Sequence, residues 1–159
     1  MNIKDYIQKL EIALENNPNL FFSQILIHLK KRYKYLHDGL EITDFYVNST
    51  FHSITLIKQN DILNIELHEN YLELRINSFL IGLYNNDYPE DIFYLIIDSS
   101  LNGEYTTIED KDVSGNIISF EITWSHNKLS NFNSRERRSL LKKKGGTSET
   151  RQGVSYLKE

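Results

Sequence analysis

Cysteine is absent from the 159-residue chain, which excludes a disulfide framework and a thiolate metal site. The amino terminus lacks the basic region and the apolar run of a secretory signal, and no apolar run elsewhere approaches the roughly 20 residues of a membrane-spanning helix. Hydrophobic residues nonetheless make up 40% of the composition and aromatic residues 12%. The composition therefore predicts one ordinary domain with a self-sufficient core and a cytoplasmic location.

Basic residues are scarce in the middle of the chain. Between His37 and Trp124, three Lys or Arg residues stand against 16 Asp or Glu residues, which gives this stretch a net charge of −13. Residues 135–159 have the opposite balance, with eight basic and three acidic residues. A strongly negative field attracts cations and repels nucleic acid, so the middle of the chain favours a basic partner.

Catalytic and metal-binding motifs are also missing from the sequence. Histidine occurs at five scattered positions: His28, His37, His52, His68 and His126. Their spacing matches no metal motif, and no glycine-flanked serine of the nucleophile-elbow type occurs. Lysines 142–144 precede their glycines, which is the reverse of the order in a phosphate loop. We therefore expect a protein that is not an enzyme and has no metal or cofactor.

The clearest structural signal is a pair of strands within residues 62–76. Apolar and polar side chains alternate on both sides of Glu69-Asn70, which is the period of two half-buried strands. A tight turn at these two residues places Glu66 opposite Glu73. Like charges directly opposite are unfavourable by up to about 1 kcal/mol. The pair is therefore either a tolerated surface feature or a site that awaits a cation.

The remaining periodicity predicts an α+β fold: an amino-terminal helical pair packed on a mainly antiparallel sheet, with one short helix before a carboxyl-terminal β-hairpin. The second helix of the pair is expected at about 20–36, and the other elements are strands at 41–48, 53–59 and 79–84, a helix at 91–101 and a hairpin of 104–111 with 116–124. The spacing from Asp87 to Glu90 predicts a capping box for the short helix, and Gly103 can close it. The register of the last hairpin stays open, because loops of two to four residues all fit.

Regular periodicity ends after Trp124. Residues 1–124 are therefore predicted to form a single α+β domain, and residues 125–159 a basic, poorly packed or flexible tail. Six basic residues of this tail are candidates for contact with nucleic acid: Arg135, Arg137, Arg138, Lys142, Lys143 and Lys144. The alternative is a solubilising tail that folds back on the acidic body.

Two acidic groups that contain tyrosine are candidate partner-binding sites. The hairpin group consists of Glu66, Tyr71, Glu73 and Arg75. The helix-start group consists of Asp87, Tyr88, Glu90 and Asp91. Charge of this kind steers the encounter with a basic protein, and aromatic side chains supply contact area.

Part of the chain resembles a known family. Leu101-Asn102-Gly103-Glu104-Tyr105 and then Asp-Val-Ser-Gly-Asn-Ile-Ile-Ser-Phe-Glu at 112–121 are similar to the carboxyl-terminal helix, glycine and hairpin of small immunity proteins from bacterial polymorphic-toxin and contact-dependent inhibition systems. The resemblance extends over residues 62–124. It implies a cytoplasmic protein that inhibits a cognate toxin domain, often a basic nuclease, by stoichiometric occlusion. The alternative function is an antitoxin-like or phage-encoded regulator that uses the basic tail on nucleic acid and the acidic body on a protein.

Overall fold

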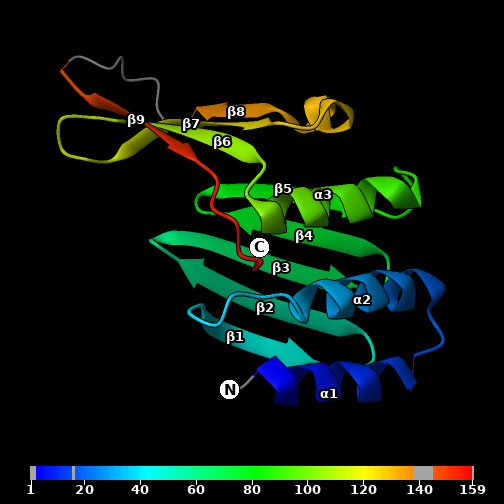
Figure 1. The fold of residues 1–159 in the computed structure, drawn as a ribbon. Coiled ribbons are helices and arrows are strands. Elements are labelled where there is room, and N and C mark those ends of the chain that lie inside the picture. The colour runs from blue at the N-terminus through cyan, green and yellow to red at the C-terminus, as the bar shows by residue number, and fades with distance from the viewer. Residues whose placement is uncertain (1–2, 16, 138–144, 159) are drawn as a thin grey trace.

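A computed structural model of the chain describes residues 3–15, 17–137 and 145–158. Its elements are α1 (Ile3–Glu15), α2 (Leu20–Tyr33), β1 (Glu41–Val47), β2 (Phe51–Lys58), β3 (Asp61–His68), β4 (Tyr71–Ile76), β5 (Phe79–Tyr84), α3 (Glu90–Asn102), β6 (Tyr105–Lys111), β7 (Ile117–Trp124), the 3-10 helix η1 (Asn127–Phe132), β8 (Ser134–Arg137) and β9 (Thr147–Gln152). The predicted α+β class is confirmed (Figure 1). In the described part of the chain, no helix is long and apolar enough to cross a membrane.

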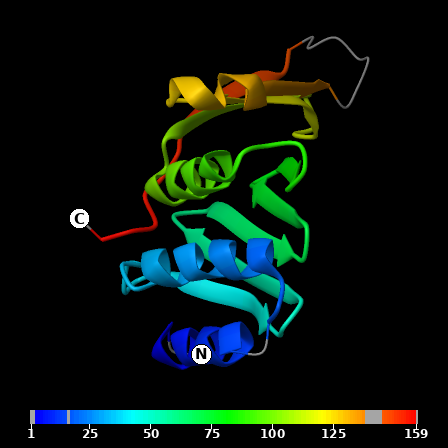
Figure 2. The ribbon, with the colours of Figure 1, turned by 90° about the vertical axis from the view of Figure 1, so that its right-hand side faces the viewer.

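The first sheet is an antiparallel meander in the order β1-β2-β3-β4-β5. The predicted register of its central hairpin is confirmed, with Glu66 opposite Glu73 and Leu67 opposite Leu72. Inward residues of this hairpin, such as Ile65 and Leu74, are fully buried. All three α-helices lie along the same side of the sheet (Figure 2). The meander therefore has one covered face and one face turned away from the helices.

The amino-terminal helices supply much of the core that covers this face. Tyr6 and Leu10 of α1 and Phe22 and Leu29 of α2 are buried in one cluster with the inward residues of the sheet. Asn19 caps α2, because its side chain accepts a hydrogen bond from the Phe22 backbone N–H at 2.9 Å. In Figure 1, α1 lies beside β1, the edge strand of the sheet.

The third helix begins differently from the sequence prediction. The residue at its N-cap is Pro89, and no side chain makes a capping hydrogen bond there. The predicted capping box is therefore wrong, because the helix starts at Glu90 and Asp87 lies two residues before the N-cap. The predicted end is correct: Gly103 has a φ of 70°, a left-handed conformation that favours glycine.

The second sheet has the order β8-β7-β6-β9 and contains strands from the segment predicted to be a tail. β9 pairs antiparallel with β6 from Thr106–Gln152 to Lys111–Thr147. Leu129 of η1 and Tyr156 are fully buried. The prediction of a poorly packed tail is thus wrong for residues 125–137 and 145–158. Both added strands are edges made of polar, mostly exposed residues, so their sequences lack the alternation of apolar and polar residues that marks a half-buried strand.

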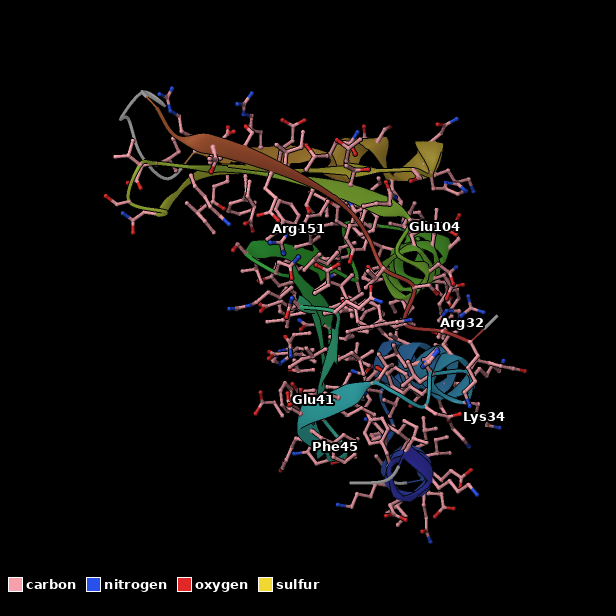
Figure 3. The ribbon with its side chains drawn as sticks, turned by 60° about the vertical axis from the view of Figure 1, so that its left-hand side comes forward. Arg32, Lys34, Glu41, Phe45, Glu104 and Arg151 are labelled. Atoms are coloured by element: carbon pink, nitrogen blue, oxygen red, sulfur yellow. The ribbon has the colours of Figure 1, made fainter. Side chains whose placement is uncertain are left out.

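Aromatic and charged contacts join the two sheets. Phe79 of β5 packs edge-on against Phe120 of β7, with 5.6 Å between ring centroids. Asp61 at the start of β3 is buried and lies 4.0 Å from the guanidinium of Arg151 on β9. Figure 3 shows Arg151 on the side of the second sheet that faces the first. The carboxyl-terminal segment continues this junction, because Leu157 forms a β-bridge with Leu36.

A polar cluster is buried between the helical pair and the first sheet. The Nε2 atom of His52 on β2 is hydrogen-bonded to the Tyr6 hydroxyl and lies 3.4 Å from the Tyr33 hydroxyl. Burial lowers the pKa of His52 from 6.5 to about 4, so its imidazole is neutral at pH 7. His52 is a polar residue on a mainly apolar face, and it contacts both helices of the pair.

Candidate protein-binding face

The outward residues of the first sheet form a surface that the helices leave uncovered, which we call the open face. It consists of Glu41, Thr43 and Tyr46 on β1, Phe51, Ser53, Thr55 and Ile57 on β2, Ile62, Asn64, Glu66 and His68 on β3, Tyr71, Glu73 and Arg75 on β4, and Leu80, Gly82 and Tyr84 on β5. Viewed nearly edge-on, the sheet has its helices on one side and side chains alone on the other (Figure 3). The structure places the whole predicted hairpin group on this face.

A continuous row of aromatic rings crosses the open face. It comprises Tyr46, Phe51, His68, Tyr71 and Tyr84, one from each strand in sheet order. Successive ring centroids are 5.9, 4.8, 5.3 and 4.9 Å apart. Such pairs add about 0.5–1.5 kcal/mol each beyond the area they bury. The terminal tyrosines of the row are each 54% exposed, so this ring row stabilises the sheet and also presents aromatic area to a partner.

Glu73 stands beside the ring row and is held in place by its neighbours. The Tyr71 hydroxyl donates a hydrogen bond to Glu73 Oε2 at 2.5 Å, and Arg75 Nη2 lies 3.6 Å from Glu73 Oε1. Gly82 leaves room for this arrangement, because a Cβ there would lie 2.9 Å from Tyr71 Cε2. Partial burial and the bond to Glu73 raise the pKa of the Tyr71 hydroxyl, which therefore remains a donor at neutral pH.

Glu66 is opposite Glu73 but has different surroundings. Its side chain is 31% exposed, compared with 18% for Glu73. Within the described residues its carboxylate accepts no hydrogen bond, and its ion-pair contact is His68 Nε2 at 3.9 Å. The repulsion predicted for the pair is thus offset mainly on the Glu73 side.

Apolar side chains continue the open face beyond the carboxylates. Leu80 on β5 is 51% exposed and Ile62 on β3 is 39% exposed. Two surface hollows of the described residues lie away from this face. One, of about 310 Å³, lies between α1 and the β1–β2 turn, and the other, of about 380 Å³, lies beside His37 and Lys158. The open face therefore offers aromatic, apolar and charged side chains to a macromolecular partner.

The helix-start group does not join the open face. Glu90 and Asp91 lie in the first turn of α3, on the helical side of the sheet. Asp91 pairs with Lys128 of η1 at 3.2 Å, and Tyr88 packs against Phe132 with 5.2 Å between centroids. Asp87 and Tyr88 are exposed just before the helix. This second group is therefore a separate surface that partly anchors η1.

The predicted nucleic-acid group lies on the second sheet where it is described. Arg135 of β8 is within 4 Å of both Asp110 and Glu121, at 3.7 and 3.9 Å. Arg137 ends the same strand. Arg138, Lys142, Lys143 and Lys144 lie outside the described residues. The described part of this group is thus mixed with carboxylates, which weakens its attraction for phosphate.

Sequence reasoning found the carboxylates of the open face but missed most of its rings. In the sequence His68 is one of five scattered histidines with no motif, and Phe51 lies outside the predicted strand 53–59. The signal was present, because aligning the outward positions of all five strands brings the rings into one row. In the described part of the chain, no three His, Asp or Glu side chains are arranged to hold a metal ion.

Comparisons of the chain with protein-family models, with curated proteins and with solved structures gave no match. The resemblance to immunity proteins therefore receives neither support nor contradiction from them.

Proposed function

We propose that this protein is a non-enzymatic inhibitor that binds a basic partner protein through the open face, in the manner of an immunity protein that occludes a cognate toxin domain. The observation that carries the proposal is the ring row beside the carboxylates of Glu66 and Glu73 on an uncovered sheet face. Aromatic side chains anchor protein interfaces, and the carboxylates steer and orient a basic surface.

The sheet edges support binding through side chains instead of by strand addition. β1 is interrupted by a bulge near Asp44, whose φ is 47°, and α1 lies beside it. β5, the opposite edge strand, lies against β7 of the second sheet. Natural sheets use such devices to block pairing with another chain. The open face is therefore the more accessible surface of the meander.

The charge of the open face favours a protein over a nucleic acid. Aromatic rows on sheets can also stack nucleic-acid bases. In this protein, however, the row adjoins two carboxylates, and residues 37–124 have a net charge of −13. Phosphates would be repelled where the bases would have to stack, whereas lysines and arginines would be attracted.

The proposal is tested with basic toxin-like domains encoded beside this gene, purified in inactive form. Their affinity for the full chain and for the Glu66→Lys, Glu73→Lys double variant is measured by isothermal titration calorimetry. We expect the double variant to bind about 100-fold or more weakly, with an unchanged or slightly higher Tm. Glu69→Lys, in the exposed turn of the same hairpin, is the matched control and should change affinity less than about 5-fold.

Equal binding by the double variant and the wild type would exclude the open face as the contact surface. A severe fall in the Tm of the double variant would show that the glutamates are structural.

A further inference from the structure

The two opposed glutamates of the open face have different roles in the structure. Glu73 accepts the Tyr71 hydroxyl at one oxygen and lies 3.6 Å from Arg75 Nη2 at the other, so both of its oxygens have a partner within the chain. Glu66 accepts no hydrogen bond within the described residues and has a single, long contact with His68. A carboxylate offers about four acceptor positions. Glu66 is thus the carboxylate of the pair with more acceptor positions open to a partner's donors.

The polar neighbour of Glu66 along its strand is also occupied. The Asn64 amide nitrogen donates to the Ile54 carbonyl at 3.3 Å and lies 3.1 Å from Thr55 Oγ1. Both partners belong to β2, so this amide is turned away from β4 and Glu73. The Asn64 amide therefore links β3 to β2 and does not donate a hydrogen bond to the Glu66 carboxylate.

Aromatic rings lie on the other side of Glu66. His68 is the next outward residue on β3, and its ring is 5.3 Å from that of Tyr71. The Tyr71 ring is fixed by its bond to Glu73 and by the space above Gly82. An incoming cation that contacts Glu66 therefore meets an ordered ring surface at the same time.

A carboxylate beside ordered aromatic rings binds arginine and lysine side chains differently. A guanidinium is planar, binds a carboxylate through two parallel N–H donors and stacks on aromatic rings. A lysine ammonium is a strongly hydrated point charge without that planar match. Arg75 shows that a guanidinium can approach a carboxylate on this face, since its Nη2 lies 3.6 Å from Glu73 Oε1.

We propose that Glu66 and the adjoining rings of His68 and Tyr71 are the receptor for an arginine side chain of the partner, with Glu73 and Gly82 as positioning residues. This inference rests on the proposed function, because it names the group that the open face recognises. The partner segment is therefore arginine-bearing, and replacing its arginine by lysine reduces binding although the charge is kept.

The test uses the full chain labelled with ¹⁵N and two blocked peptides, Gly-Arg-Gly-Arg-Gly and Gly-Lys-Gly-Lys-Gly, added to millimolar concentration. Amide shifts in the NMR spectrum locate each peptide and give its affinity. We expect both peptides to shift the outward positions of β3 and β4, with the arginine peptide about 3-fold or more tighter, which corresponds to an exposed cation–π contact.

Single variants then test whether Glu66 and Glu73 have different roles in binding. Glu66→Gln should abolish the preference for arginine, whereas Glu73→Gln should weaken both peptides by a similar factor and keep the preference. Glu69→Gln removes the same charge from the turn and should leave the affinity ratio unchanged. Retention of the arginine preference in Glu66→Gln would overturn the assignment.

Failure of this inference differs from failure of the proposed function. Equal affinities of both peptides at the open face would contradict the arginine receptor while supporting a basic partner. Shifts at Asp87, Glu90 and Asp91, or none at all, would contradict the open face itself and therefore both proposals.

Discussion

The two sheets of this protein are assembled in different ways. In the first sheet, every pair of neighbouring strands is consecutive in the chain. In the second, β9 pairs with β6 at the edge opposite β8, so that Ile108 is opposite Thr150. The first sheet depends on local turns and an apolar face, whereas the second depends on long-range pairing by strands with little apolar area. The carboxyl-terminal segment should therefore matter far more to stability than its composition indicates.

Removal of the carboxyl-terminal segment should have the largest effect on stability. Truncation after Trp124 deletes η1, β8 and β9 together with the fully buried Leu129 and Tyr156. Loss of two large core side chains at about 2–5 kcal/mol each approaches the whole stability of a typical domain. We expect urea unfolding to show a loss of about 5 kcal/mol or more, or no folded protein. An unchanged midpoint would show that the first sheet and its helices fold independently of the segment.

A single residue should reproduce much of that effect. Tyr156 is fully buried beside the junction of the sheets, and its hydroxyl faces that of Tyr105 without meeting the geometry of a normal hydrogen bond. Tyr156→Ala should lose about 3–5 kcal/mol by chemical denaturation, because it leaves a cavity. Tyr156→Phe keeps the ring and removes an unpaired buried hydroxyl, so it should be neutral or stabilising by up to about 1 kcal/mol. Comparable losses in both variants would mean that the hydroxyl is bonded in solution.

The same difference explains what could be predicted from the sequence. The β3–β4 register followed from the alternation of Ile65 and Leu74 with the opposed glutamates, because one face of that hairpin is buried. β9 has no such alternation: its residues Thr147–Gln152 form an edge whose partner lies about 40 residues earlier. This pairing is stabilised by the backbone hydrogen bonds between β9 and β6 and by the burial of Tyr156, which follows β9. Neither contribution can be read from the local pattern of apolar residues.

Some residues of the candidate site could likewise be predicted from a local pattern, and others could not. Glu66 and Glu73 could be located from one hairpin, since a single turn sets their register. The ring row needed the registers of all five strands, including the position of Phe51 at the start of β2. The hydrogen bond from Tyr71 that separates the roles of the two glutamates depends on side-chain geometry above Gly82.

The buried histidine makes the first sheet sensitive to acid. The folded-state pKa of His52 is about 4, compared with 6.5 when exposed, so the unfolded chain binds more protons between these values. Its contribution to stability is constant above pH 6.5 and declines as the pH falls toward 4, by about 3 kcal/mol in total. Urea unfolding between pH 7 and pH 4 measures this decline. His52→Gln should flatten the curve in this window, and an unaltered slope would assign the acid sensitivity to other groups.

The smallest expected effect concerns the open face of the first sheet. Glu66→Gln removes one of two opposed charges, and like charges at this position cost up to about 1 kcal/mol. Arg75 and Tyr71 already offset part of the repulsion at Glu73, so we expect a gain of about 0.3–0.5 kcal/mol in low salt. The gain should shrink in 1 M salt, where the screening length is about 3 Å. Glu69→Gln in the turn should change stability by less than Glu66→Gln does. A loss of stability in Glu66→Gln would mean that this carboxylate is bonded within the chain, and it would then have no free acceptor for a partner's arginine.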